Sequence, residues 1–177
     1  TVWYNCKNYR ANLHFDENGL RIRDLTKFDE DYQEQYLETA CEGWLATYDN
    51  LPVIDGRLWS TESSKCALYL ERQVTDIHAT EQGETELCVQ VTFADGAMGS
   101  ILFSEKGITF SQCGDLRYRT GNPGEKTVIS FEPGKLKGCH NGFAYEIEIQ
   151  GQIVKEVGGA RLRAKDGCVA LKMDIRR

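Results

Sequence analysis

The stretch Leu87-Cys88-Val89-Gln90-Val91-Thr92-Phe93 places an apolar side chain at every second position, with Cys88, Gln90 and Thr92 between them. A period of two is typical of a β-strand that buries one face and exposes the other. Asp95-Gly96 follows almost at once, and this pair favours a tight turn into a second strand over 100–103. The stretch therefore predicts antiparallel strands joined by hairpins.

The same signals recur on both sides of this stretch. Asp16-Glu17-Asn18-Gly19 predicts a hairpin between strands over 11–15 and 20–25, because Asn-Gly tolerates the positive φ that the turn needs. Alternation and flanking turn residues predict further strands over 66–74, 108–110, 116–119, 127–131, 143–150, 152–154, 160–164 and 168–175. The segments 48–59 and 138–142 are interpreted as a shaped loop and a polar turn.

One segment has helical spacing instead. From Asp29 to Tyr48 the apolar residues recur at intervals of three and four, which predicts an amphipathic helix near the N-terminus. Acidic residues at the start of this segment suit the positive end of a helix dipole, and Pro52 lies just beyond its end.

These elements predict a mainly β protein. About ten strands without β-α-β alternation favour an antiparallel β-sandwich of the jelly-roll or lectin type, with an up-and-down β-barrel as the alternative. Alternation does not decide between them, because every strand has one inward face in both folds. The 177 residues suit a single β-rich domain over 1–177, and the start at Thr1 suggests a domain excised from a longer protein.

Charge and cysteine content limit the partners and the compartment. A formal charge of −6 argues against nucleic acid and against an anionic membrane surface, and no apolar run approaches the ~18 residues of a membrane span. The seven cysteines are scattered and odd in number, so we expect free thiols, no zinc site and a cytoplasmic location, with secretion as the alternative. No nucleotide-binding motif is present and no cofactor is expected.

Aromatic, amide and charged residues concentrate in the first sixty positions. Aromatic rings stack on the apolar faces of sugars, while carboxylate, amide and guanidinium groups hydrogen-bond their hydroxyls. The sequence therefore predicts a carbohydrate-binding or accessory module of a carbohydrate-active protein, with other domains of a larger chain as further partners. The candidate ligand-binding residues are Tyr9, Arg10, His14, Arg21, Arg23 and Trp59.

Three Arg-x-Arg pairs bear on the kind of ligand. Arg21 and Arg23 share a strand face in this interpretation, and two guanidiniums there could clamp the carboxylate of a uronic or sialic acid. The pairs at 117/119 and 161/163 repeat the pattern, which also arises simply on solvated outer faces. If the pairs lay side by side in one sheet, they would form a local anion-binding surface.

Two other functions stay open. Asp49 and Asp55 are the candidate catalytic residues of a glycosidase or polysaccharide lyase that uses an Asp pair, because glycoside hydrolysis needs two carboxyl groups across a cleft. A non-catalytic structural or small-ligand-binding β domain is the third interpretation.

Overall fold

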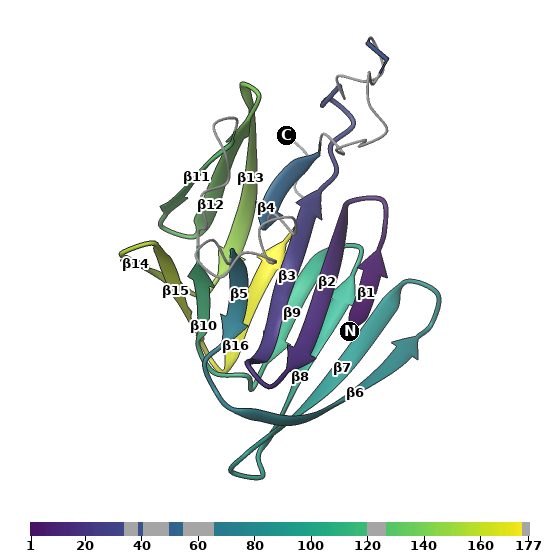
Figure 1. The fold of residues 1–177 in the computed structure, drawn as a ribbon, viewed down its shortest axis with the longest axis vertical. Helices are drawn as coiled ribbons and strands as arrows, with labels where there is room; N and C mark the ends of the chain where they lie inside the picture. Colours follow the sequence, from purple (N-terminus) through teal and green to yellow (C-terminus); the bar gives the residue numbers. More distant parts are fainter. Residues whose placement is uncertain (34–38, 41–49, 55–65, 120–126, 175–177) are drawn as a thin grey trace.

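Sixteen strands in two antiparallel sheets account for the regular structure in the computed structural model, which describes residues 1–33, 39–40, 50–54, 66–119 and 127–174 (Figure 1). Sheet A has the order β1-β2-β3-β5-β10-β15-β14, with β4 also paired to β3, and sheet B has the order β11-β12-β13-β16-β9-β8-β7-β6. The sheets do not close into a barrel, so the predicted sandwich is confirmed and the barrel alternative is wrong.

The strand bounds are as follows. Sheet A contains β1 (Val2–Asn5), β2 (Tyr9–Asp16), β3 (Gly19–Lys27), β4 (Leu51–Ile54), β5 (Ala67–Leu70), β10 (Leu116–Arg119), β14 (Gln152–Glu156) and β15 (Gly159–Arg163). Sheet B contains β6 (Val74–Gln82), β7 (Glu86–Phe93), β8 (Met98–Ser104), β9 (Gly107–Ser111), β11 (Thr127–Glu132), β12 (Lys135–His140), β13 (Phe143–Gln150) and β16 (Cys168–Lys172).

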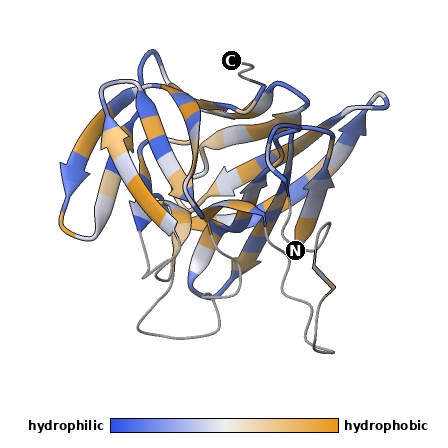
Figure 2. Cartoon of the chain, turned by 90° about the horizontal axis from the view of Figure 1, so that it is seen from above, coloured by the Kyte–Doolittle hydropathy of each residue, from blue (hydrophilic) through white to orange (hydrophobic). Residues whose placement is uncertain are grey.

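The core lies between the two sheets and is built from their alternating apolar faces. Val89, Val91 and Phe93 of β7 are buried as predicted, and the apolar positions of β13 and β16 are buried in the same way. Figure 2 shows hydrophobic and hydrophilic residues alternating along the strands. This alternation gives each sheet an outer face, turned away from its partner, whose side chains are available for other contacts.

Two local predictions were wrong because glycine and proline were taken as turn signals. Segment 138–142 is mostly strand, since β12 continues to His140 and only Asn141-Gly142 turns, both with positive φ. Gly138 serves packing there: a Cβ on it would lie 2.1 Å from the Tyr145 ring. Likewise Leu51–Ile54 is a strand, β4, whose Pro52 lies at the edge of the sheet.

The expected strand over 66–74 is instead divided between the sheets. β5 ends at Leu70 in sheet A, and β6 begins at Val74 in sheet B. At this crossover Arg72 forms an ion pair with Asp95 at 2.7 Å, and its guanidinium lies 3.7 Å from the ring centroid of Phe93. The crossover therefore prevents consecutive strands from pairing around a barrel.

The predicted helix over 29–48 falls largely outside the described residues. Asp29–Gln33 are described and form a turn, in which the Asp29 carboxylate accepts a hydrogen bond from the Asp31 amide at 3.1 Å. The Tyr32 ring packs edge-on against Phe143, with centroids 5.2 Å apart. The described residues contain no helix, and so none that could span a membrane.

The described cysteines are free thiols, as predicted. Cys113 is buried, its thiol lies 3.4 Å from the carbonyl oxygens of Ser100 and Ser111, and burial raises its pKa to about 11. It behaves as a small core residue.

Tyrosine hydroxyls at the core connect the two sheets. The Tyr9 hydroxyl on β2 lies 2.9 Å from the carbonyl oxygen of Ser104 and 3.0 Å from that of Gly107, at the β8–β9 turn of sheet B. Tyr4 on β1 donates to the Thr85 carbonyl at 2.6 Å, and Tyr145 of sheet B donates to the Pro52 carbonyl of sheet A. These contacts hold sheet A in one position over sheet B.

Tyr9→Phe should therefore destabilise the fold. The change removes the hydrogen bond that the Tyr9 hydroxyl donates between the sheets, and the loss of such a bond costs about 0.5–1.5 kcal/mol. Urea unfolding should show a lower midpoint with an unchanged slope. Tyr69→Phe is the matched control, because Tyr69 lies on the outer face of sheet A, and its midpoint should move little. Equal midpoints for the Tyr9 variant and the unaltered protein would contradict the proposed connection.

Candidate functional site

Four of the predicted ligand-binding residues lie together on the outer face of sheet A. Arg10 and His14 alternate along β2 with the buried residues Tyr9, Ala11 and Leu13 and therefore point away from the core. His14 pairs in register with Arg21 on β3, and paired residues project to the same side of a sheet.

A β-bulge brings Arg23 and Asp24 to the same face. Asn12 pairs with Asp24 and Leu13 pairs with Ile22, which leaves Arg23 as an extra residue in β3. If side chains alternated regularly along β3 with no bulge, Asp24 would point toward the core and Leu25 would point outward. Ile22 and Leu25 on either side of the bulge are both fully buried, so the core pattern survives it.

Asn12 holds the centre of this group. It is fully buried although it belongs to the outer face, and its side-chain oxygen accepts a hydrogen bond from Arg23 Nε. Its amide nitrogen donates to the Val2 carbonyl at 3.4 Å. Next to it, the Arg10 guanidinium donates to the Asp24 carboxylate at 3.1 Å. The two arginines are thus held by defined partners before any ligand arrives.

A second group surrounds Asp16 at the end of the β2–β3 hairpin. Arg21 makes two hydrogen bonds to this carboxylate, at 2.7 and 2.8 Å, and His14 Nε2 lies 3.2 Å from it. The hydrogen bonds from Arg21 hold the pKa of Asp16 well below its usual range. Burial, and then the charges of Arg23 and Arg21, lower the pKa of His14, which favours a neutral imidazole. His14 Nδ1 lies 2.8 Å from the Thr1 hydroxyl.

Trp3 belongs to this face and was missed from the sequence. It pairs with Asn12 across β1 and β2, and 57% of its surface is exposed. The Arg10 guanidinium lies 6.0 Å from the Trp3 ring centroid, and Arg10 Nε is buried without a hydrogen-bond partner. The alternation of Val2, Trp3 and Tyr4 was the available signal, but a strand this short at the start of the chain is weak evidence.

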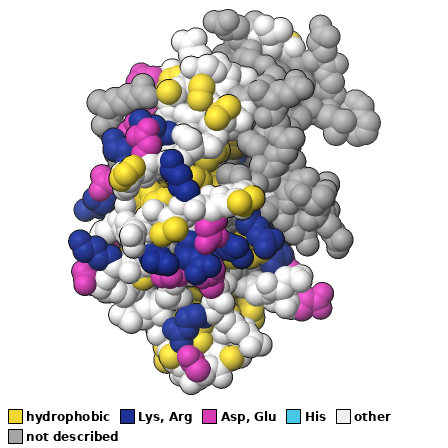
Figure 3. Space-filling view, turned by 90° about the vertical axis from the view of Figure 1, so that its left-hand side faces the viewer, with side chains coloured by type: hydrophobic (Ala, Val, Ile, Leu, Met, Phe, Trp, Pro, Cys, Tyr) yellow, Lys and Arg dark blue, Asp and Glu magenta, His cyan; other side chains and the backbone are white. Residues whose placement is uncertain are grey.

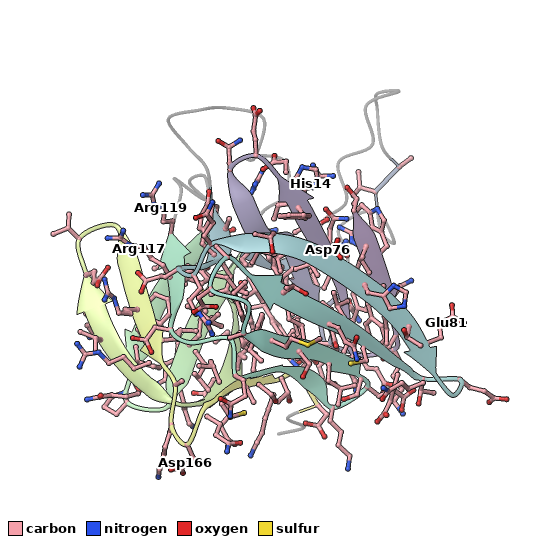
Figure 4. All side chains as sticks on the ribbon, turned by 90° about the horizontal axis from the view of Figure 1, so that it is seen from below. His14, Asp76, Glu81, Arg117, Arg119 and Asp166 are labelled. Carbon is pink, nitrogen blue, oxygen red and sulfur yellow. The ribbon has the colours of Figure 1, made fainter. Side chains whose placement is uncertain are left out.

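The face continues across the sheet as a row of paired residues, here called the cross-strand row: Arg21 on β3, Tyr69 on β5, Arg117 on β10 and Arg161 on β15. Glu156 pairs with Arg117 at 3.2 Å and with Arg161 at 3.1 Å. In Figure 4, His14, Arg117 and Arg119 lie on the same side of the molecule. All three Arg-x-Arg pairs therefore belong to one sheet.

The remaining predicted site residues are not part of this face. Tyr9 is fully buried in the core, so its ring is not exposed to a ligand on the outer face. Trp59 and the candidate catalytic residues Asp49 and Asp55 lie outside the described residues.

A pocket of about 410 Å³ opens at another place, where β3 ends near Asp29 and Asp174. Lys27 lines it and is 5% exposed, and its ammonium group donates to the Met173 carbonyl at 3.0 Å. Burial lowers the pKa of Lys27, although Asp29 and Asp174 oppose the shift. This contact connects the end of sheet A to the end of sheet B and gives Lys27 a structural role.

No group of His, Cys, Asp and Glu side chains suited to a metal ion occurs among the described residues.

Arg21→Gln should raise the pKa of His14. The change removes a positive charge that disfavours the imidazolium, and it removes the two hydrogen bonds that compete with His14 for the Asp16 carboxylate. Titration of the imidazole signals by NMR should show the His14 midpoint moving up toward 6.5. Lys172→Gln on the outer face of sheet B should leave the midpoint where it is. A His14 midpoint that falls in the Arg21 variant would refute this electrostatic account.

Comparison with known proteins gives no relative. No family model, no curated protein and no solved structure matches this chain.

Proposed function

We propose that this chain is a carbohydrate-binding β-sandwich and that its ligand binds the outer face of sheet A over β1, β2 and β3. The observation that carries the proposal is the exposed indole of Trp3 beside Arg10, His14 and Arg23 on one face. An exposed aromatic ring offers an apolar surface for a sugar ring, and the surrounding guanidinium and imidazole groups offer hydrogen bonds to hydroxyls.

The rigidity of the face supports the same proposal. Asn12, Asp24 and Asp16 hold the arginine side chains through hydrogen bonds that exist without a ligand. A ligand therefore meets side chains whose rotamers are already restricted, and less conformational entropy is lost on binding.

The free thiols suit the cytoplasmic location that accompanies the proposal.

Trp3→Ala should weaken glycan binding roughly tenfold, because loss of a stacking ring costs on the order of 1 kcal/mol or more. An array of neutral and acidic glycans identifies the ligand, and calorimetry then compares the variants. Val128→Ala is the matched control, since Val128 is an exposed apolar residue of sheet B, and its affinity should equal that of the unaltered protein. If no glycan binds, or if Trp3→Ala binds as tightly as the unaltered protein, the proposal fails.

A further inference from the structure

We infer that the carbohydrate bound by this face is an acidic glycan, a polysaccharide chain of uronic acid units that crosses β3, β5, β10 and β15 along the cross-strand row. This inference rests on the proposed function. It names the ligand class and extends the site beyond β1–β3.

Arginine and lysine are separated in this fold. Every described arginine except Arg72 lies on the outer face of sheet A: Arg10, Arg21, Arg23, Arg117, Arg119, Arg161 and Arg163. The outer face of sheet B carries lysines instead, and Lys137 and Lys172 form ion pairs there with Glu132 and Glu148. Simple solubility needs no such separation. Arginine is the better partner for carboxylates, because its planar fork matches their two oxygens.

The register aligns the row across the strands. Arg21 pairs with Tyr69, Tyr69 with Arg117, and Arg117 with Arg161. Neighbouring strands are about 4.8 Å apart, so the row spans about 14 Å of backbone from β3 to β15. Guanidinium groups at intervals of one or two strands suit a polymer that carries a carboxylate on each sugar ring. Figure 3 shows Lys and Arg side chains gathered in a band with Asp and Glu side chains among them.

Two arginines on the outer face of β10 keep donors for a ligand, Arg117 in the cross-strand row and Arg119 two residues beyond it on the same strand. Arg117 contacts Glu156 through one terminal nitrogen, at 3.2 Å, and a guanidinium carries five N–H donors. Arg119 forms no ion pair with a described carboxylate, and its guanidinium lies 5.6 Å from the ring centroid of Tyr69. These two residues could therefore hold a ligand carboxylate without breaking the ion pairs that position the row.

The carboxylates that pair with the arginines of the row favour a glycan over a nucleic acid. Asp16, Glu71 and Glu156 lie among the arginines, and Glu71 pairs with Arg161 at 3.3 Å. They repel the anionic groups of either polymer, but the hydroxyls of a polyuronate can donate hydrogen bonds to them and the phosphate groups of a nucleic acid backbone cannot.

The test compares polygalacturonate, a neutral galactan and single-stranded DNA by affinity electrophoresis and calorimetry, at low and at high salt. Polygalacturonate should bind most tightly, and salt should weaken its binding because the contacts are ionic. Arg117→Gln and Arg119→Gln should each lower the affinity for polygalacturonate roughly tenfold. Arg117→Lys keeps the charge without the fork and should lose part of the affinity. Lys172→Gln, which removes one charge from the outer face of sheet B, should bind as the unaltered protein does.

The outcomes separate the two proposals. Equal binding of galactan and polygalacturonate, unaffected by salt or by Arg119→Gln, would overturn the acidic ligand and leave carbohydrate binding intact. Tighter binding of DNA than of polygalacturonate would also overturn it. Failure of every glycan to bind would overturn both. The Arg119→Gln variant should fold normally, because removal of this guanidinium leaves no described carboxylate unpaired.

Discussion

The burial of one face of each sheet against the other constrains everything else in this structure. Because side chains alternate along a strand, a buried residue fixes the direction of its neighbours. Tyr9 and Leu13 must face sheet B, and Arg10 and His14 must then face outward. The hydroxyl of Tyr9 reinforces this arrangement by reaching the β8–β9 turn. The candidate binding face is thus a consequence of how the core packs.

The bulge in β3 opposite Asn12 and Leu13 interrupts that alternation at the candidate site. It adds Arg23 without disturbing the core and places Asp24 beside Arg10. Bulges often redirect side chains near functional sites. Here the extra residue lets buried Asn12 hold Arg23, so that several charged groups occupy a small area in fixed positions. The charges on the face are largely paired, which limits their mutual repulsion.

The sequence predicted the strands whose apolar residues alternate, as along Val89, Val91 and Phe93, and it predicted a sandwich. It also grouped Arg10, His14, Arg21 and Arg23, and the structure places them on one face because two adjoining strands and a hairpin turn bring them together locally. The cross-strand row was beyond it: the pairing of Arg117 with Arg161 and of Tyr69 with Arg21 depends on strand order, which alternation does not specify. The prediction of a turn over 138–142 was wrong because a glycine needed for close packing cannot be told from a turn glycine in a single sequence.

The most direct test of this account is NMR mapping of the arginine side chains during titration with an oligogalacturonate. Each guanidinium Nε–H gives its own signal and reports contact with a carboxylate. We expect the signals of Arg117 and Arg119 to shift together with those of Arg21 and Arg161, while the signal of Arg72 at the sheet crossover stays unchanged. Shifts confined to Arg72 and to residues of sheet B would contradict it.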